Sequence, residues 1–293
     1  EWNGKYRDDM RRFLKGDTFM LHAAAQRIMG SPDLYPPEGR GSNASVNFLT
    51  CHDGFCLNDL YSYNTKHNEG NGWSNADGTN DNYSWNCGVE GETDDPDVLS
   101  LRLRMMENAF AVLLCSRGTP MFLSGDEFGD TRYGNNNPYC PDNPVSWLDW
   151  SLIEKNQNLF SFVKYMIAFR KRHPAIRTDL PAGRFSFPSM SFHGIHPWEP
   201  VSDLESHVLC VLFSGFDKEQ QIQDTIYLAI NTHWEPVTLF LPDLPFEWNW
   251  HIAVNTGDPS RTIFQDTEMP PADHTVLLGE RSVILFVVKK RSV

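Results

Sequence analysis

A histidine and an aspartate stand side by side as His52 and Asp53, directly after a short apolar run. Residues 46–50 are β-prone and Gly54 supplies a turn after the pair, so the pattern predicts a strand that ends at these two side chains. In α/β proteins, active sites gather at the carboxyl ends of the strands. We therefore interpret residues 46–55 as a strand whose tip does chemistry. The alternative is a His-Asp pair in an ordinary loop.

Residues 64–97 form a stretch of Asn, Gly, Asp, Ser and Trp that is too long for a passive connection. Its amides offer donors and acceptors, while Trp73, Tyr83 and Trp85 offer flat apolar faces, a combination that suits a sugar. A flexible, turn-rich surface loop has the same composition and stays open as the alternative. A calcium loop beginning at Asp77 is rejected, because Asn82 stands where Gly is needed and Gly88 where a bidentate Glu is needed.

The composition excludes several classes of function. The 293 residues are 40% hydrophobic and 22% charged, and their formal charge of -13 repels phosphate backbones and anionic membranes. No apolar run is long enough to span a membrane, and no secretory signal opens the chain. The six cysteines contain no C-x-x-C pair, so we expect reduced thiols in a cytosolic protein and no metal site. Neither nucleic acid nor a membrane is an expected partner.

The elements that would position these residues alternate between strand and helix. A short buried strand is predicted at 119–124, tipped by residues 125–129 and followed by a second Asn-rich loop up to Pro144. Apolar periodicity predicts helices at 6–14, 18–29, 98–115 and 159–172. Asp17 is the expected N-cap of the helix at 18–29.

Beyond Arg177 the helical periodicity gives way to short β-rich runs separated by turns. Their spacing predicts a small antiparallel sandwich. The expected strands are 208–213, 225–230, 236–241, 248–254, 274–278 and 283–288.

Four motifs together resemble the isoamylases and bacterial glycogen-debranching enzymes of the α-amylase superfamily. They are residues 46–55, 84–91, 118–129 and 134–140. The resemblance implies an α/β plus all-β fold: residues 1–177 would be the last strands and helices of a TIM (β/α)8 barrel, with residues 1–3 ending its sixth strand. Residues 178–293 would be the carboxyl-terminal β-sandwich domain.

The resemblance also implies what residues 1–293 lack. Such enzymes carry a nucleophilic Asp and an acid/base Glu on earlier barrel strands, and a retaining glycosidase needs its two carboxyl groups about 5 Å apart. Asp126 and Glu127 are adjacent and would point to opposite sides of an extended chain, so we expect them to hold the strand tip instead. We therefore expect the chain alone to be inactive and to depend on the missing amino-terminal part of its own barrel.

By the same resemblance, Asp53 and His52 bind the sugar ring at the cleavage position and stabilise its transition state. The expected partner is a branched α-glucan such as glycogen, amylopectin or a limit dextrin, cleaved at α-1,6 linkages without a cofactor. The expected location is the bacterial cytoplasm, with a plastid as the alternative. A non-catalytic glucan-binding or regulatory subunit is the alternative function, and an α-1,4-specific amylase is a rival within the enzyme class. The expected substrate-binding residues are Lys66, His67, Asn68, Trp85, Asn86 and Tyr133.

Overall fold

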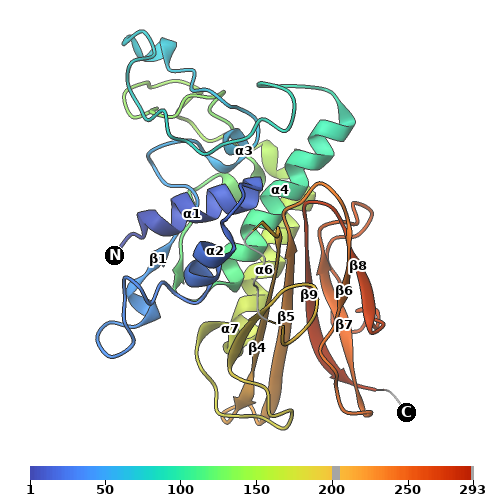
Figure 1. The fold of residues 1–293 in the computed structure, drawn as a ribbon. Coiled ribbons are helices and arrows are strands. Elements are labelled where there is room, and N and C mark those ends of the chain that lie inside the picture. The colour runs from blue at the N-terminus through green and yellow to red at the C-terminus, as the bar shows by residue number, and fades with distance from the viewer. Residues whose placement is uncertain (200–204, 292–293) are drawn as a thin grey trace.

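The computed structural model describes residues 1–199 and 205–291 (Figure 1). Its α-helices are α1 (Gly4–Lys15), α2 (Leu21–Ile28), α3 (Leu57–Leu60), α4 (Pro96–Cys115), α5 (Leu152–Lys155), α6 (Gln157–Arg172) and α7 (Pro174–Arg177). Short 3-10 turns are η1 (Ser42–Ala44), η2 (Glu69–Asn71) and η3 (Asp126–Phe128). The strands are β1 (Val46–Asn47), β2 (Thr119–Pro120), β3 (Met190–His193), β4 (Val208–Asp217), β5 (Ile222–Asn231), β6 (Val237–Phe240), β7 (Trp248–Asn255), β8 (Thr275–Leu278) and β9 (Ser282–Lys290).

The four helices expected from apolar periodicity are confirmed as α1, α2, α4 and α6. Helix α1 begins where the Asn3 side chain accepts a hydrogen bond from the Tyr6 amide, 2.9 Å long, and ends at Gly16, whose φ of 94° only glycine adopts readily. Helix α4 has Asp95 as its N-cap and Pro96 in its first turn.

The expected cap of α2 is wrong. This helix starts at Leu21 after Met20, which makes no side-chain cap. Asp17 instead forms ion pairs with Arg12, at 3.2 Å, and with Lys15, at 3.1 Å. The Asp17 carboxylate pairs with the last turn of α1 because the cations of Arg12 and Lys15 both lie there within ion-pair distance.

Three short parallel segments lie side by side at the amino-terminal end of the fold. β1 pairs with β2 in parallel, and Trp2 forms a parallel bridge with Val46 on the other side. The Asn3 amide donates to the Val46 carbonyl at 2.9 Å, and the Val46 amide donates to the Glu1 carbonyl at 2.8 Å. The carboxyl ends of all three segments therefore share one edge.

The carboxyl-terminal residues form antiparallel sheets. Five strands pair in the order β3-β4-β5-β9-β7, and β6 pairs with β8 in a separate two-stranded sheet. Each of the expected β-rich runs overlaps one of these strands, and those at 236–241 and 274–278 extend one residue beyond β6 at each end and one residue before β8. Strand β3 was not predicted from the sequence.

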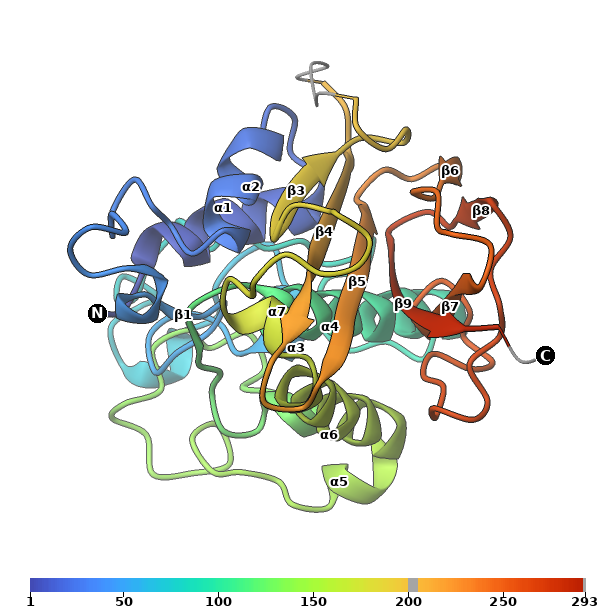
Figure 2. The ribbon, with the colours of Figure 1, turned by 90° about the horizontal axis from the view of Figure 1, so that it is seen from below.

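The five-stranded sheet is buried on both faces. Along β4, Leu209 and Val211 join the cluster shared with the helices, whereas Cys210 and Leu212 join the cluster shared with β6 and β8. Alternate side chains of a strand point to opposite faces, so this strand reads as a continuous apolar run. Figures 1 and 2 show α4, α6 and α7 on one side of the sheet, with β6 and β8 on the other.

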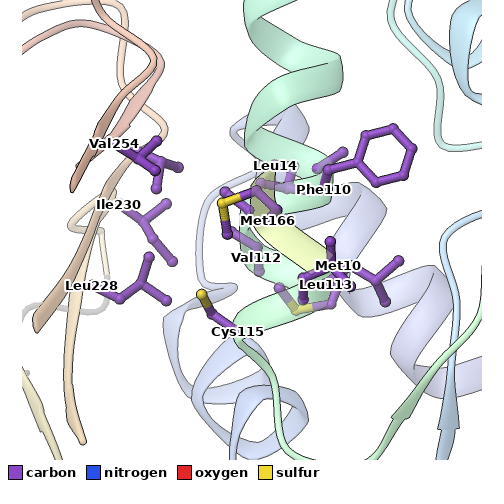
Figure 3. Packing of buried hydrophobic residues seen from close by; sticks show 14 of the residues in the cluster. Met10, Leu14, Phe110, Val112, Leu113, Cys115, Met166, Leu228, Ile230 and Val254 are labelled. Atoms are coloured by element: carbon purple, nitrogen blue, oxygen red, sulfur yellow. The ribbon is translucent and has the colours of Figure 1, made fainter. Parts of the chain in front are cut away.

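One hydrophobic cluster joins the helical part to the sheet (Figure 3). Leu228 and Ile230 line its sheet side, and Val112 and Met166 face them from α4 and α6. The proposed division at residues 177 and 178 therefore separates two parts that share a core.

Candidate functional site

His52 and Asp53 lie exposed beyond the end of β1. Their side chains are 69% and 75% accessible to solvent, and His52 Nε2 lies 3.4 Å from Asp53 Oδ2. The Trp2 ring meets His52 edge-on at 5.5 Å between centroids. Gly54, with φ of 82°, turns the chain and donates its amide to the Asn136 carbonyl at 3.0 Å. The tip thus presents an open carboxylate and an open imidazole.

A cavity of about 320 Å³ opens beside Asp53. Its walls come from the strand tip, from α1 and from both Asn-rich loops, and they carry charged and amide groups. The lining residues are Arg7, Arg11, Asp53, Gly54, Gly78, Thr79, Asp81, Asn136 and Asn137. Another cavity, of about 210 Å³, lies between α4, α6 and residues 256–263, away from this tip.

Arg11 is buried under the cavity. Its Nε donates to the Leu49 carbonyl at 2.7 Å, and Nη1 donates to the Asn82 carbonyl at 3.1 Å. Nη2 is buried and has no hydrogen-bond partner among the described residues. Burial lowers the pKa of Arg11 to about 10, which leaves the guanidinium charged at neutral pH. It therefore places a positive charge beneath a site that contains carboxylates.

The asparagines of the two loops bind one another. Asn68 is fully buried, its Nδ2 donates to Asn136 Oδ1 at 2.8 Å, and its Oδ1 accepts from the Asn136 amide at 2.9 Å. A Cβ on Gly78 would lie 2.2 Å from Asn136 Oδ1, so only glycine fits beside this pair. Asn71 and Asn137 both donate to Asp77 Oδ2 at 2.8 Å. Asn68 is not placed to meet a ligand directly, and these amides fasten the loops together.

Glu90 organises the stretch that contains His67 and Asn86. Its carboxylate accepts the amides of Asn64 and Thr65 at 2.8 and 3.1 Å, and Asn86 Nδ2 at 3.0 Å. His67 Nε2 lies 3.4 Å from the same carboxylate. Burial would raise the pKa of Glu90, but these hydrogen bonds outweigh it and lower the pKa to about 2. His67 and Asn86 were both expected to bind sugar, and Glu90 contacts one side-chain nitrogen of each.

Lys66 and Tyr133 hold different positions around the loops. Lys66 Nζ donates to the carbonyls of Asp77 and Gly78 at 2.7 and 3.3 Å. Tyr133 is exposed, and Asp59 fixes its loop by accepting the Thr131 hydroxyl at 2.6 Å and the Gly134 amide at 3.1 Å. Of the expected sugar-binding residues, Tyr133 has its ring open to solvent.

Trp85 lies half-buried between the loop and the carboxyl-terminal sheet. Its amide donates to the Leu60 carbonyl at 3.0 Å, and the Arg281 guanidinium lies over its ring at 4.3 Å from the centroid. It also packs against the main hydrophobic cluster. The Trp85 ring is therefore partly exposed on the loop and partly packed into the hydrophobic core.

Asp126 ties the tip of β2 to the His52-Asp53 segment. Its carboxylate accepts the Thr50 hydroxyl, the Leu57 amide at 2.8 Å and the Leu123 amide at 3.1 Å. Burial raises the pKa of Asp126 to about 6, although these hydrogen bonds favour the charged form. The side chain is 1% exposed, so it holds the strand tips together, as expected from the sequence.

Sequence reasoning missed several residues that line the Asp53 cavity: Arg7, Arg11, Thr79 and Asp81. Arg7 and Arg11 are four residues apart on α1 and so share a helix face. That spacing was a usable signal, whereas nothing in the sequence brings residues 79 and 81 to Asp53.

Within the described ranges 1–199 and 205–291, no three His, Cys, Asp or Glu side chains are grouped to hold a metal ion. No helix in these ranges is long and apolar enough to cross a membrane.

No family model matches the chain, but curated proteins and solved structures do. A GlgX glycogen operon protein homolog of Mycobacterium tuberculosis H37Rv is 56% identical, over 88% of this chain and 38% of its own length. The chloroplastic isoamylase 3 of rice is 46% identical, over 88% of this chain and 32% of its own length. The chain belongs to the isoamylase and GlgX family. It spans about two fifths or less of these relatives.

The isoamylase-family chain also shares its fold with pullulanases. Type I pullulanase of Bacillus subtilis 168, solved with maltose, superposes with a TM-score of 0.68 at 19% identity, over 98% of this chain and 35% of the pullulanase. Pullulanase from Bacillus acidopullulyticus gives a TM-score of 0.67 at 18% identity, over 98% of this chain and 30% of that structure. At these identities the likeness concerns the fold alone.

Hydrogen bonds join residues 46–55 to residues 118–129 and 134–140, three of the four motifs that carry the family resemblance. Leu57, after the His-Asp tip, donates its amide to Asp126, and Gly54 donates to the Asn136 carbonyl. The His67 amide donates to the Gly134 carbonyl at 2.7 Å. Segments that are far apart in this isoamylase-family sequence are thus held together near Asp53.

Proposed function

We propose that this chain is the carboxyl-terminal part of a glycoside hydrolase that cleaves α-1,6 branch linkages of glycogen-type glucans by a retaining mechanism. Residues 1–177 supply the last strands and helices of its (β/α)8 barrel, and residues 178–293 form its β-sandwich domain. The parallel pairing of Trp2, β1 and β2 supports the barrel assignment. The antiparallel sheets support the sandwich assignment. The enzyme works in a bacterial cytoplasm, with a plastid as the alternative.

The observation that carries this proposal is the open carboxylate of Asp53 at a strand tip, beside a cavity lined with amide and charged groups. Asp53 accepts hydrogen bonds from sugar hydroxyls and stabilises the positive charge that develops on the ring in the transition state. His52 binds the same ring. The nucleophile and the acid/base stand outside residues 1–293, and no cofactor is required.

The names of the relatives support the substrate class. Curated relatives are glycogen operon proteins and isoamylases, and several pullulanases of the same fold were solved with maltose or longer maltooligosaccharides. The substrate is therefore a branched α-glucan: glycogen, amylopectin or a limit dextrin. Exposed Tyr133 and half-buried Trp85, on the two Asn-rich loops, offer the apolar faces that sugar rings need. Lys66, His67 and Asn86 contribute side-chain hydrogen-bonding capacity that their contacts within the protein do not use.

Asp53→Asn in the full-length enzyme tests the proposal. The substitution keeps the shape and one acceptor but removes the charge, so fold and glucan binding survive. Losing a preorganised electrostatic partner costs roughly a hundred- to a thousand-fold in kcat. Because the defect is confined to the transition state, kcat and kcat/KM fall together. Initial rates of reducing-end release from amylopectin, with binding measured separately, give both quantities.

The control is Asp94→Asn, the same change at an exposed carboxylate outside the cavity, which leaves the rates unchanged. Near-normal kcat in Asp53→Asn would remove Asp53 from the catalytic list. A full-length wild type that binds amylopectin without hydrolysing it would instead identify a non-catalytic glucan-binding subunit. Wild type that cleaves amylopectin but leaves linear amylose intact would distinguish α-1,6 cleavage from an α-1,4 amylase, which degrades both.

A further inference from the structure

The turn between β8 and β9 reaches from the carboxyl-terminal sheet to the helices and to the Trp85 segment. Asn108 of α4 donates its Nδ2 to the Arg281 carbonyl at 2.8 Å, and Arg104 of α4 donates to Glu280 Oε1 at 2.9 Å. The Arg281 amide donates to the His233 carbonyl at 2.8 Å. Helix α4 on one side and His233 on the other therefore hold the β8–β9 turn in place.

The Arg281 side chain crosses to the amino-terminal part. Nη1 donates to the Lys15 carbonyl, at the end of α1, at 3.0 Å, and to the Thr232 carbonyl at 3.5 Å. The guanidinium lies over the Trp85 ring at 4.3 Å from the centroid, in a half-buried place. A cation over an indole face is attracted more strongly when water is excluded. Arg281 therefore contacts one face of the Trp85 ring, and its hydrogen bonds to backbone carbonyls hold its own side chain in place.

Other residues hold the backbone around Trp85. Arg102 of α4 donates to the carbonyls of Gly91 and Asn86 at 2.8 and 3.0 Å, and the Trp85 amide donates to the Leu60 carbonyl. These bonds fix where the Trp85 segment runs but not how its ring is turned. Ring orientation depends on what lies against the indole, which is the main hydrophobic cluster and, over one face, the Arg281 guanidinium.

We propose that Arg281 is a positioning residue that sets the orientation of Trp85 for binding the branched glucan. The carboxyl-terminal sheet then takes part in substrate recognition through this one turn. The inference rests on the proposed function, because it takes the sugar as the partner of Trp85. Arg281 does not touch the reacting atoms, so its loss weakens binding without changing the chemical step.

The test is a double-mutant cycle in the full-length enzyme. Arg281→Leu keeps bulk but removes the cation, and we expect KM for amylopectin to rise about three- to ten-fold, the range of a partly buried cation–π contact, with kcat within two-fold of wild type. Trp85→Ala raises KM at least as much. In the Trp85→Ala background, Arg281→Leu has no further effect, because the two residues act as a unit.

Two further variants separate positioning from general stability. Arg281→Lys keeps a cation near the ring and recovers part of the KM loss. Arg184→Leu is the matched control, because Arg184 lies over Trp248 at 5.1 Å on an exposed surface, and its loss leaves KM unchanged. Circular dichroism and melting temperature confirm that each variant is folded.

An unchanged KM in folded Arg281→Leu would overturn the inference, and so would additive effects of Arg281→Leu and Trp85→Ala. If Arg281→Leu fails to fold, Arg281→Lys carries the test, and a wild-type KM in the Trp85→Ala variant would then overturn the inference. If full-length wild type shows no hydrolysis, the proposed function fails, and the same cycle is read from dissociation constants for amylopectin. The two failures are therefore distinguishable.

Discussion

Carboxylates in this chain are held in very different environments. Asp53 is exposed, whereas hydrogen bonds lower the pKa of Glu90 to about 2 against the opposing effect of burial. Burial raises the pKa of Glu107 to about 8, because the Thr262 hydroxyl at 3.4 Å and the charge of Arg104 compensate little. Glu107 lies on α4 and lines the cavity of about 210 Å³. At neutral pH it is therefore mainly protonated in the folded chain.

Glu107→Gln makes stability less dependent on pH. The pKa rises from 4.5 when unfolded to about 8 when folded, so between these values the folded chain holds a proton that the unfolded chain has lost. The free energy of unfolding therefore falls as pH rises through this window. Gln resembles the neutral acid and is free of that loss, so at pH 8 the variant is more stable than wild type by on the order of a few kcal/mol.

Urea unfolding at pH 5, 6, 7 and 8 measures the effect. Wild type and Glu107→Gln approach each other at pH 5 and diverge as pH rises, while exposed Glu154→Gln follows wild type throughout. Parallel curves for wild type and Glu107→Gln would show that Glu107 is ionised in the folded chain.

At the scale of elements, the sequence predicted what depends on local pattern. The amphipathic stripe of α1, with Tyr6, Met10, Phe13 and Leu14 buried, was readable directly. The strand at 46–50 was predicted by its apolar run, but only Val46–Asn47 pairs regularly. The Asn68–Asn136 pair was not predictable, because it joins loops that are far apart in the sequence and no periodicity encodes it. Composition suggested sugar contacts, whereas folding uses many of these amides internally.

Gly78→Ala is expected to separate the two loops. A Cβ at this position meets Asn136 Oδ1 at 2.2 Å and Asn68 Nδ2 at 2.7 Å, and the φ of 71° is itself unfavourable for alanine. The contact between the two loops at Gly78 and Asn136, which line the Asp53 cavity, is then disrupted. We expect faster amide hydrogen exchange over residues 66–79 and 134–137, and glucan binding weakened about ten-fold or more, consistent with one or two kcal/mol of lost organisation.

Gly70→Ala is the matched control in the same loop. Nothing lies within 4 Å of a Cβ at Gly70, so both exchange and binding stay as in wild type. If Gly78→Ala also behaved as wild type, the loops would not depend on this close contact.

At the scale of the whole molecule, the two parts are joined by a common core and by the β8–β9 turn. Helices α4 and α6 pack against the five-stranded sheet through one hydrophobic cluster, so the sheet supports the loops that carry the candidate site. The antiparallel sheets were predicted from short β-rich runs separated by turns. Their contact with Trp85 was not predicted, because Arg281 lies 196 positions away and its turn has no distinctive pattern.

The chain of 293 residues on its own should release no reducing ends from glycogen or amylopectin. A retaining mechanism needs two carboxyl groups about 5 Å apart, one acting as nucleophile and the other as acid and base. We place both outside residues 1–293. Asp126 is buried and accepts hydrogen bonds from Thr50, Leu57 and Leu123, and the carboxylates that line the cavity are Asp53 and Asp81.

Purified chain and full-length enzyme are assayed side by side on amylopectin at equal molar concentration, and only the full-length enzyme is expected to act. If the chain alone hydrolyses amylopectin, Asp53→Asn and Asp81→Asn are made in it. Loss of that activity in both variants would assign the two required carboxyl groups to the cavity itself, and the proposed role of the missing barrel part would be wrong.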